Sequence, residues 1–446
     1  MRRALILLLG AVVSCFPESF SISDAGPPDV GSDIPLPDAG PIADTGPERD
    51  VVEPLDAQPD AAPSNRVEVE CATPWSDLGP EPTADCAGRN VSVVGEGIGP
   101  NAVDIALLES QEVALAWNSN ELFDSGGIEL RVLNTDTLEP TRTAAIAPEA
   151  VLGELAGRSI SLVPEGEDVH IAYWVERDGG STIDYRRWSG TLSAAETISA
   201  VGRSGDVSLG VSERGDATFA VYDQVSGRYF ARTRLNSGEL EASVPLGEDM
   251  VQVALESRGI SLVHLNGVSH LASRRRLGEV RAQLRYRRRT SLDSWSGATA
   301  IASPRGERNS GLAVDIAAFG DQVAVVYLDW LSGQVEVRLA TWNSTPDDVS
   351  VQILATYASE EPPVYTPLDV EYDAFGLIHV LFSDDEGDRD VQYMRQASDG
   401  GRWVSDTVVV VTSEASIRAR FVVGRARQPH IVFTARGDVH YATIRP

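Results

Sequence analysis

Seven polar residues recur at matching places in a repeated pattern of short β-strands, and their types suggest shared chemistry. Three of them are Asp and one is Arg, so together they could hold a cation such as calcium, or a polar ligand. Positions of this kind are commonly occupied by polar side chains and water, with no bound ion. We therefore expect no resident cofactor. The seven are Asp104, Ser159, Ser208, Gln252, Asp315, Asp369 and Arg420.

Three His lie at equivalent places in apolar runs, each three residues before an aromatic residue. Three imidazoles suggest a metal site, but equivalent positions on separate repeats lie far apart unless they line a common axis. Apolar runs of this kind predict strands that are buried on both faces. We therefore expect His170, His379 and His430 to be packed, hydrogen-bonded side chains rather than metal ligands.

Arginine recurs once per repeat on a later strand, at Arg131, Arg186, Arg232, Arg285, Arg338 and Arg395. Converging Arg side chains can hold a carboxylate substrate, but one Arg per repeat predicts a spread around the molecule and a solvated surface. A denser group, Arg274 to Arg276 with Arg285 and Arg287 to Arg289, predicts a local basic patch. Docking of an anionic partner on this patch stays open.

Ordered catalytic motifs are absent from the sequence. The chain has no Gly-x-Ser-x-Gly, no His-Glu-x-x-His and no phosphate-binding Gly loop. Paired carboxylates for glycoside hydrolysis remain open, because they can be assembled from separate loops that no local motif reveals. No catalytic pair is therefore named from the sequence.

The elements that carry these residues repeat, and the clearest copy runs from Leu368 to Trp403. Within it, Asp369 to Tyr372 alternates polar and apolar residues, as a half-buried strand does. A turn with Gly376 follows, and Leu377 to Phe382 is long enough for one fully buried strand. Two further short strands complete an antiparallel meander.

Apolar runs like the one in this copy recur about every 53 residues, and such a period with four strands per copy is typical of a β-propeller. The runs are Val113 to Trp117, Val169 to Tyr173, Ala217 to Tyr222, Ile260 to Leu265, Val323 to Tyr327, Leu377 to Phe382 and His430 to Phe433. We predict an all-β fold, a seven-bladed β-propeller of four-stranded antiparallel blades over residues 90–446. The fourth copy is irregular, with an insertion from Asn266 to Arg281, and six blades is the alternative.

The two ends of this region complete one blade. The last copy ends after its third strand, and Val91 to Val94 predicts a strand that has no first three. Pairing the two would close the ring and remove both sheet edges.

Several copies resemble the sialidase/BNR-type propeller repeats of secreted bacterial proteins. The resemblance rests on Gly376, His379 and Phe382 with Tyr393 and Arg395, and on His170-Ile-Ala-Tyr173 with Asp184-Tyr185-Arg186. It covers most of residues 90–446 and implies a propeller fold.

Residues 1–15 predict an export signal, because Arg2 and Arg3 precede an apolar run that is too short to span a bilayer. Val12-Val13-Ser14-Cys15 resembles the bacterial lipobox, which implies a lipidated Cys15 and stable anchoring by acyl chains. Phe16 in the next position favours the outer membrane by the sorting pattern of that family. We expect a bacterial cell-envelope lipoprotein, and an ordinary signal peptide is the alternative.

Two segments separate this signal from the repeats. Residues 16–66 hold ten Pro between Phe16 and Asn65, and eleven acidic residues against one Arg. Such a segment cannot bury enough apolar surface to offset chain entropy, so it predicts a disordered stalk. Residues 67–89 hold Cys71 and Cys86, which predict a disulfide-bearing cap in an exported protein.

The composition limits the partners. The net charge is −29 and the chain has no Lys, so it is a poor binder of polyanions and nucleic acid is not expected. We expect a monomer that contacts the membrane through its lipid anchor only.

These observations favour a binding or scaffolding module for a glycan or a protein. The partner would dock on the loop face, on segments such as 178–181, 266–278 and 384–390. The alternative is a carbohydrate-active enzyme, a glycoside hydrolase or lyase on a propeller scaffold. A cluster of Trp, paired carboxylates and Arg on one face would favour the enzyme, and a face of mixed loops would favour binding.

Overall fold

The computed structural model describes the chain from Arg89 to Ile444, except for connecting segments. The described residues are 89–96, 102–119, 127–146, 159–177, 180–201, 205–223, 226–246, 259–276, 282–290, 294–302, 309–331, 333–359, 367–383, 391–397, 402–409, 418–425, 427–435 and 438–444. Cys15, residues 16–66, Cys71 and Cys86 lie outside them, so lipidation, stalk and disulfide stay predictions. In the described part, no helix has the length and apolarity needed to cross a membrane.

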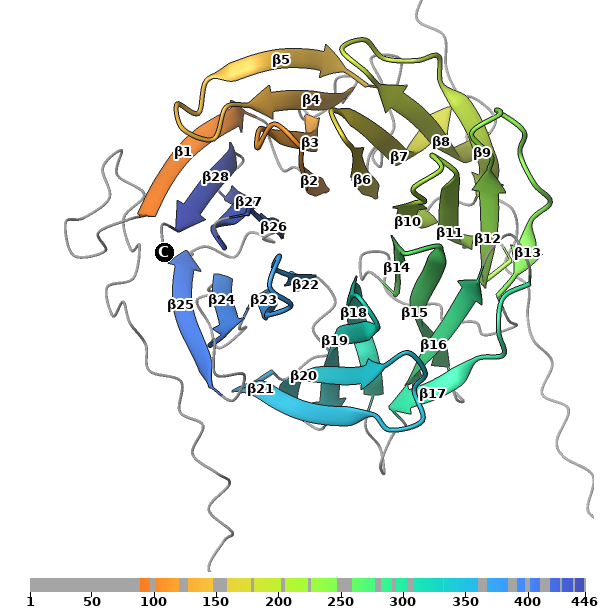
Figure 1. Ribbon diagram of the computed structural model, residues 1–446, viewed down its shortest axis with the longest axis vertical. Coiled ribbons are helices and arrows are strands. Elements are labelled where there is room, and N and C mark those ends of the chain that lie inside the picture. The colour runs from red at the N-terminus through yellow and green to blue at the C-terminus, as the bar shows by residue number, and fades with distance from the viewer. Residues whose placement is uncertain are drawn as a thin grey trace, which may run out of the picture. The chain divides into compact units, whose positions relative to one another are not determined.

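Seven four-stranded antiparallel sheets form the blades of a ring (Figure 1). Blade one is β2 (Val103–Leu107), β3 (Val113–Ser119), β4 (Gly127–Leu133) and β5 (Pro140–Ala145). Blade two is β6 (Ile160–Glu165), β7 (Asp168–Arg177), β8 (Gly180–Trp188) and β9 (Glu196–Val201). Blade three is β10 (Gly205–Val211), β11 (Ala217–Asp223), β12 (Arg228–Arg234) and β13 (Val244–Pro245).

The remaining blades follow the same order. Blade four is β14 (Ile260–Leu265), β15 (Val268–Arg276), β16 (Ala282–Thr290) and β17 (Thr299–Ala302). Blade five is β18 (Asn309–Phe319), β19 (Gln322–Leu331), β20 (Gln334–Asn343) and β21 (Ser350–Ala358). Blade six is β22 (Leu368–Tyr372), β23 (Ile378–Ser383), β24 (Val391–Gln396) and β25 (Trp403–Val409). Blade seven is β26 (Ala419–Val423), β27 (Pro429–Ala435) and β28 (Asp438–Ile444), completed by β1 (Arg89–Glu96).

The ring closes as predicted. β1 pairs antiparallel with β28, with Val91 opposite Ala442, so the start of the repeat region supplies the last strand of blade seven. The first strand of each blade contacts the first strand of the next, from β2 to β26 and back to β2. The seven-bladed count and the four-stranded antiparallel blades are confirmed, and the six-bladed alternative is wrong.

In blade four, the sequence pattern assigned the strands incorrectly. Ile260–Leu265 is its first strand, β14, and not the second strand that its apolar run suggested. The supposed insertion contains the true second strand, β15, whose three closing Arg residues conceal its β pattern. Asn266 and Gly267, with φ of 50° and 75°, form the tight turn between them, since both positions need a left-handed backbone.

The hydrophobic core lies between neighbouring blades rather than at the axis. The second strands are almost wholly buried, and β23 is buried at every residue. One cluster joins Ala116 and Leu130 of blade one to Ile171 and Trp188 of blade two. Packing of this kind fixes each blade against the next, and it leaves the first strands to line the axis.

Candidate functional site in the axial channel

One residue from the first strand of each blade belongs to a chain of contacts around the axis, and we call these seven residues the inner ring. They are Asp104, Ser161, Ser208, Ser261, Asp315, Asp369 and Arg420. In five steps the side chain accepts a backbone N–H from the next blade. The donors are Leu162 to Asp104 (2.7 Å), Leu209 to Ser161 (3.1 Å), Leu262 to Ser208 (2.9 Å), Val370 to Asp315 (3.0 Å) and Phe421 to Asp369 (3.0 Å).

Contacts between side chains complete the remaining two steps of the inner ring. The Ser261 hydroxyl donates to Asp315 Oδ1 at 2.6 Å. The Arg420 guanidinium lies 4.0 Å from Asp104 on one side and 4.0 Å from Asp369 on the other. Blade seven therefore contributes the one cation of the inner ring, and it stands between two carboxylates.

The inner ring has a simple physical cause. The first strand is the edge of its blade, so one side of its backbone has no strand partner. A buried N–H without a partner would be costly, and the polar side chain of the preceding blade supplies the acceptor. Polar residues in the middle of otherwise apolar strands are the sequence signal of this arrangement.

Five of the residues singled out from the sequence belong to the inner ring: Asp104, Ser208, Asp315, Asp369 and Arg420. Ser159 does not. It lies two positions before Ser161 on the chain, and its hydroxyl donates to Asp206 at 2.8 Å in the neighbouring blade. Residues two positions apart, such as Ser159 and Ser161, point to the same face of a strand. The alternation of polar and apolar residues therefore could not show which of the two belongs to the inner ring.

Gln252 lies outside the described residues, and Ser261 is the residue that blade four contributes to the inner ring. Comparison of the repeats with one another placed the first strand of this blade too early in the sequence, because Ile260–Leu265 was assigned to the second strand. Ser161 and Ser261 are therefore the two positions that sequence reasoning missed.

A cavity of about 320 Å³ extends from the inner ring along the axis. It follows the first strands toward the end of the ring that bears the turns between first and second strands, which we call the turn face. Two residues beyond the inner ring, the wall is Ala106, Val163, Gly210, Val263, Glu371 and Val422. Glu371 is thus the single ionisable side chain in this layer of the described wall.

The electrostatics of the cavity set Glu371 apart. Burial, together with the neighbouring Asp315 and Asp104 charges, raises the pKa of Glu371 to about 8. Glu371 therefore keeps its proton at neutral pH. No hydrogen bond or ion pair from another described residue engages its carboxyl group. Burial and the Asp315 charge also raise the pKa of Asp369 well above its usual range, and Arg420 opposes that shift.

The described carboxylates at the channel are not grouped as a set of metal ligands. Among the described residues, no group of three or more His, Cys, Asp or Glu side chains is arranged to hold a metal ion. Both oxygens of Asp315 already accept hydrogen bonds, from Ser261 and Val370. The geometry gives the calcium hypothesis no support in the channel, and what it offers is a protonated carboxyl beside carboxylates and one Arg.

The three His predicted to be packed and hydrogen-bonded lie inside their blades, each against a Tyr of the adjacent strand. Their Nδ1 atoms lie 2.7 Å from the Tyr185 hydroxyl in His170, 2.5 Å from Tyr393 in His379 and 2.5 Å from Tyr441 in His430. The sequence missed a fourth pair, His270 with Tyr286 at 2.7 Å, because β15 was taken for an insertion.

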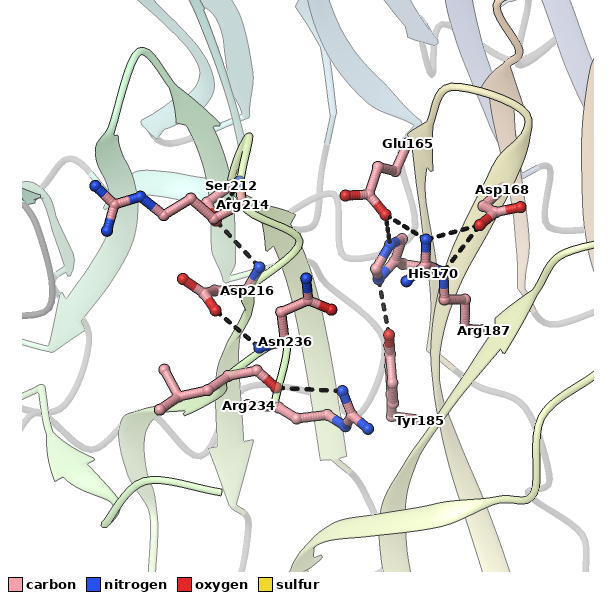
Figure 2. A network of polar contacts seen from close by, with 11 residues as sticks. Glu165, Asp168, His170, Tyr185, Arg187, Ser212, Arg214, Asp216, Arg234 and Asn236 are labelled. Carbon is pink, nitrogen blue, oxygen red and sulfur yellow. Dashed lines mark hydrogen bonds and ion pairs between the residues drawn. The ribbon is translucent and has the colours of Figure 1, made fainter. Parts of the chain in front are cut away.

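Figure 2 shows the pair of blade two, where Glu165 and Tyr185 lie on either side of His170. Glu165 lies 3.1 Å from His170 Nε2, and Arg187 bridges Glu165 and Asp168 at 2.7 Å each. Burial is the main cause of a lowered pKa in His170. Tyr185 is itself buried against Phe219 of blade three, so the pair holds blades together and cannot reach a substrate.

The third-strand Arg residues are distributed around the ring, as predicted, but they are not simply solvated. Arg131 donates to the Val94 carbonyl of β1 at 2.5 Å and lies over the Trp117 ring. Arg232 donates to the Ile198 carbonyl of blade two at 2.5 Å. Each reaches the outer strand of the preceding blade, because the third strand lies beside it, and these Arg act as links between blades.

The Arg-rich strands of blade four do not form one basic face. Arg289 donates to Thr233 of blade three at 2.7 Å, whereas Arg288 donates to the Ser344 carbonyl of blade five at 3.3 Å. Successive strand residues point to opposite faces of the blade. Arg288 and Arg289 are therefore divided between two neighbouring blades.

A shared binding face on the three proposed segments stays a prediction. Asn266 and Gly267 form the turn between a first and a second strand, on the turn face, and residues 268–276 of the same segment are strand β15. Residues 178–179, 277–278 and 384–390 lie outside the described residues.

The described Trp residues do not gather at the channel. Trp117, Trp174, Trp188, Trp342 and Trp403 are all buried within or between blades. No Trp or Tyr is among the described residues that line the axial cavity. Of the features that would favour an enzyme, carboxylates and Arg converge in the cavity and the aromatic cluster does not.

Comparisons with known proteins show a likeness in fold alone. No protein-family model matches the chain, and no curated protein matches it. The chain is similar to U3-55K at 10% identity, covering 80% of this chain and 98% of that one, with a TM-score of 0.46. It is similar to the Hadza microbial sialidase Hz136 at 10% identity, covering 80% and 68%, with a TM-score of 0.42. It is also similar to an α-L-arabinanase of Penicillium chrysogenum at 12% identity, covering 64% and 92%, with a TM-score of 0.40. Two of these three neighbours are glycoside hydrolases by name, and at such distance the likeness concerns the fold.

Proposed function

We propose that this protein hydrolyses a glycoside in the axial cavity, with Glu371 as the general acid. The observation that carries the proposal is a carboxyl group that keeps its proton at neutral pH, faces the cavity and has no partner among the described residues. General acids of glycoside hydrolysis need this property, since they must deliver a proton to the leaving oxygen.

Asp104 is the second carboxylate of the proposed mechanism. It faces the same cavity, from blade one, and Arg420 lies 4.0 Å from it. In the reaction, the bond between the anomeric carbon and the glycosidic oxygen breaks while a bond from that carbon to a water oxygen forms. Glu371 gives its proton to the leaving oxygen, and Asp104 takes the proton of the attacking water. Both carboxyl groups are restored by one exchange with solvent.

This proposal differs from the expectation drawn from the sequence, which favoured binding without catalysis. The convergence of Glu371, Asp104 and Arg420 in one cavity is the reason for the change. The cavity volume suits a single sugar ring, and its wall is apolar around Glu371, which keeps the acid protonated. A glycan is the partner under the proposed function, whereas the binding module would take a glycan or a protein.

The test is a hydrolysis screen of the full chain on aryl glycosides and polysaccharides, with Glu371→Gln beside it. We expect turnover that falls at least a hundredfold in Glu371→Gln, on the scale of a lost general acid. Glu139→Gln, the same change at an exposed Glu outside the cavity, is the matched control and should retain activity. Saturable glycan binding without turnover would instead support the binding module, and silence on both would indicate a protein partner.

We also propose that the chain is exported and anchored through Cys15. Support comes from the lipobox-like sequence around Cys15 and from the Pro- and Asp-rich segment that follows it. A full-length chain expressed in a bacterium should partition into detergent, and Cys15→Ala should partition into the aqueous phase. Equal partition of the two would overturn the anchor.

A further inference from the structure

The turn face carries a second cavity, of about 590 Å³, between blades five and six. Its floor is apolar, formed by Trp342, Leu339 and Ile378, which are buried. Tyr372, Gln352 and Gln396 line its walls, and further polar side chains stand at its rim. We call this cavity the interblade groove.

The interblade groove is separate from the axial cavity although one strand serves both. Glu371 and Tyr372 are consecutive residues of β22, and successive residues of a strand point to opposite faces. Glu371 lines the axial cavity, and Tyr372 lines the interblade groove. A ligand in one cavity therefore does not occupy the other.

The polar groups of the interblade groove are held in place by the blades. Gln352 Oε1 accepts the indole N–H of Trp403 at 3.2 Å, which leaves its NH₂ group as the donor for a ligand. The backbone N–H of Ile378 donates to Gln396 Oε1 at 3.4 Å. The Gln352 amide, fixed through its oxygen, presents its NH₂ group in a set direction, which lowers the entropy lost when a ligand binds.

Tyr372 adds an aromatic face and a hydroxyl donor. Its ring lies 5.9 Å from the Phe319 ring, and Phe319 is 38% exposed, so apolar ring surface is exposed next to Tyr372. No hydrogen bond from a described residue reaches the Tyr372 hydroxyl. Burial raises the pKa of this hydroxyl, so it remains a donor.

The character of the lining limits the ligand. No Arg is among the described residues of the interblade groove, and Asp347 and Asp348 stand exposed at its rim, so an anion would be repelled. Amides, hydroxyls and carboxylates can exchange hydrogen bonds with sugar hydroxyls, while an aromatic ring packs on the C–H face of a sugar. The volume suits one or two sugar rings.

We propose that the interblade groove binds a neutral saccharide, independently of any reaction in the axial cavity. Tyr372 and Gln352 are its recognition residues, Tyr372 through its hydroxyl and ring and Gln352 through its amide NH₂.

The experiment is calorimetric titration of the full chain with neutral monosaccharides and disaccharides, namely glucose, galactose, mannose, arabinose, lactose and cellobiose. All variants carry Glu371→Gln so that hydrolysis cannot distort the titration. Tyr372→Phe removes one hydroxyl and should weaken the binding constant about fivefold. Gln352→Glu keeps the acceptor for Trp403, removes the donor and should weaken it about tenfold.

The matched control is Tyr222→Phe, which removes the hydroxyl of another partly buried Tyr, at the end of β11 and outside the groove. It should bind as the parent does, and thermal melting will confirm that all the variants fold. Equal affinity in every variant, or no binding of any of these sugars, would overturn the inference. Binding of uncharged peptides but no sugar would overturn the ligand class. Sugar binding in an unmutated chain that hydrolyses nothing would leave this inference standing and defeat the proposed function alone.

Discussion

Asp315 of blade five accepts the backbone N–H of Val370 in blade six at 3.0 Å, through one oxygen of a carboxylate whose other oxygen accepts the Ser261 hydroxyl of blade four. One side chain thus joins three blades. The inner ring uses the polar side chain of one edge strand to satisfy the backbone of the next, so stability and cavity chemistry reside in the same residues.

Asp315→Ala should lower the free energy of unfolding by about 3 kcal/mol, because it leaves a buried N–H and a buried hydroxyl without partners. Asp315→Asn keeps an acceptor for Val370 and should cost about 1 kcal/mol. Urea unfolding at pH 7 measures both. Asp136→Ala, in an exposed turn, is the control and should change stability by no more than about 0.5 kcal/mol. Equal losses in Asp315→Ala and Asp136→Ala would contradict the role of the inner ring.

Glu371→Gln should make the protein more stable at pH 8 and change it little at pH 4. The folded pKa of about 8 lies above the ordinary value of 4.5, so the folded state holds a proton that the unfolded state releases. The stability that Glu371 contributes is complete below pH 4.5 and is lost as the pH rises through 8. Thermal melting should show that the variant gains about 4 kcal/mol of stability relative to the parent between pH 4 and pH 9. Parallel curves would show that Glu371 ionises normally.

Most of the fold was predictable from the sequence, because a propeller repeats one local pattern seven times. Buried second strands such as Ile378–Ser383 are continuous apolar runs, and the unpaired strand at Val91 identified the closure. Blade four was misassigned because Arg274 to Arg276 end its second strand with charges. The pattern of local hydrophobicity cannot show that a charged residue is held by a neighbouring blade.

The candidate site was predictable in part. Asp104, Asp315, Asp369 and Arg420 were found because they interrupt apolar strands at one register. Glu371 was not found, because a Glu two residues further along an alternating strand is indistinguishable from a solvated side chain. Its raised pKa depends on burial at the axis and on the charges of Asp315 and Asp104, which lie far away in the sequence and meet it only there.

Acid should destabilise the blades through the buried His residues. Burial lowers the pKa of His430 to about 4, and the unfolded value is about 6.5, so the unfolded state binds the proton first. The stability that neutral His430 contributes is therefore present above pH 6.5 and is lost as the pH falls toward 4. His430→Gln should reduce the loss of stability between pH 7 and pH 4 by about 3 kcal/mol, as measured by urea unfolding. His440→Gln, at another buried His of blade seven, tests whether any His removal has the same effect; an identical change in both would refute the assignment to His430.

Closure of the ring by β1 should be required for a stable monomer. A chain that starts at residue 97 lacks β1, so the outer edge of β28 is exposed and its backbone groups are left without partners. We expect this chain to melt at least 10 °C below a chain that starts at residue 89, and to associate through the open edge, as gel filtration will show. The chain from residue 89 keeps the full pairing from Arg89 with Ile444 to Glu96 with Asp438, and is the matched control. Equal melting temperatures and a monomer in both would mean that the other blades hold the ring closed without β1.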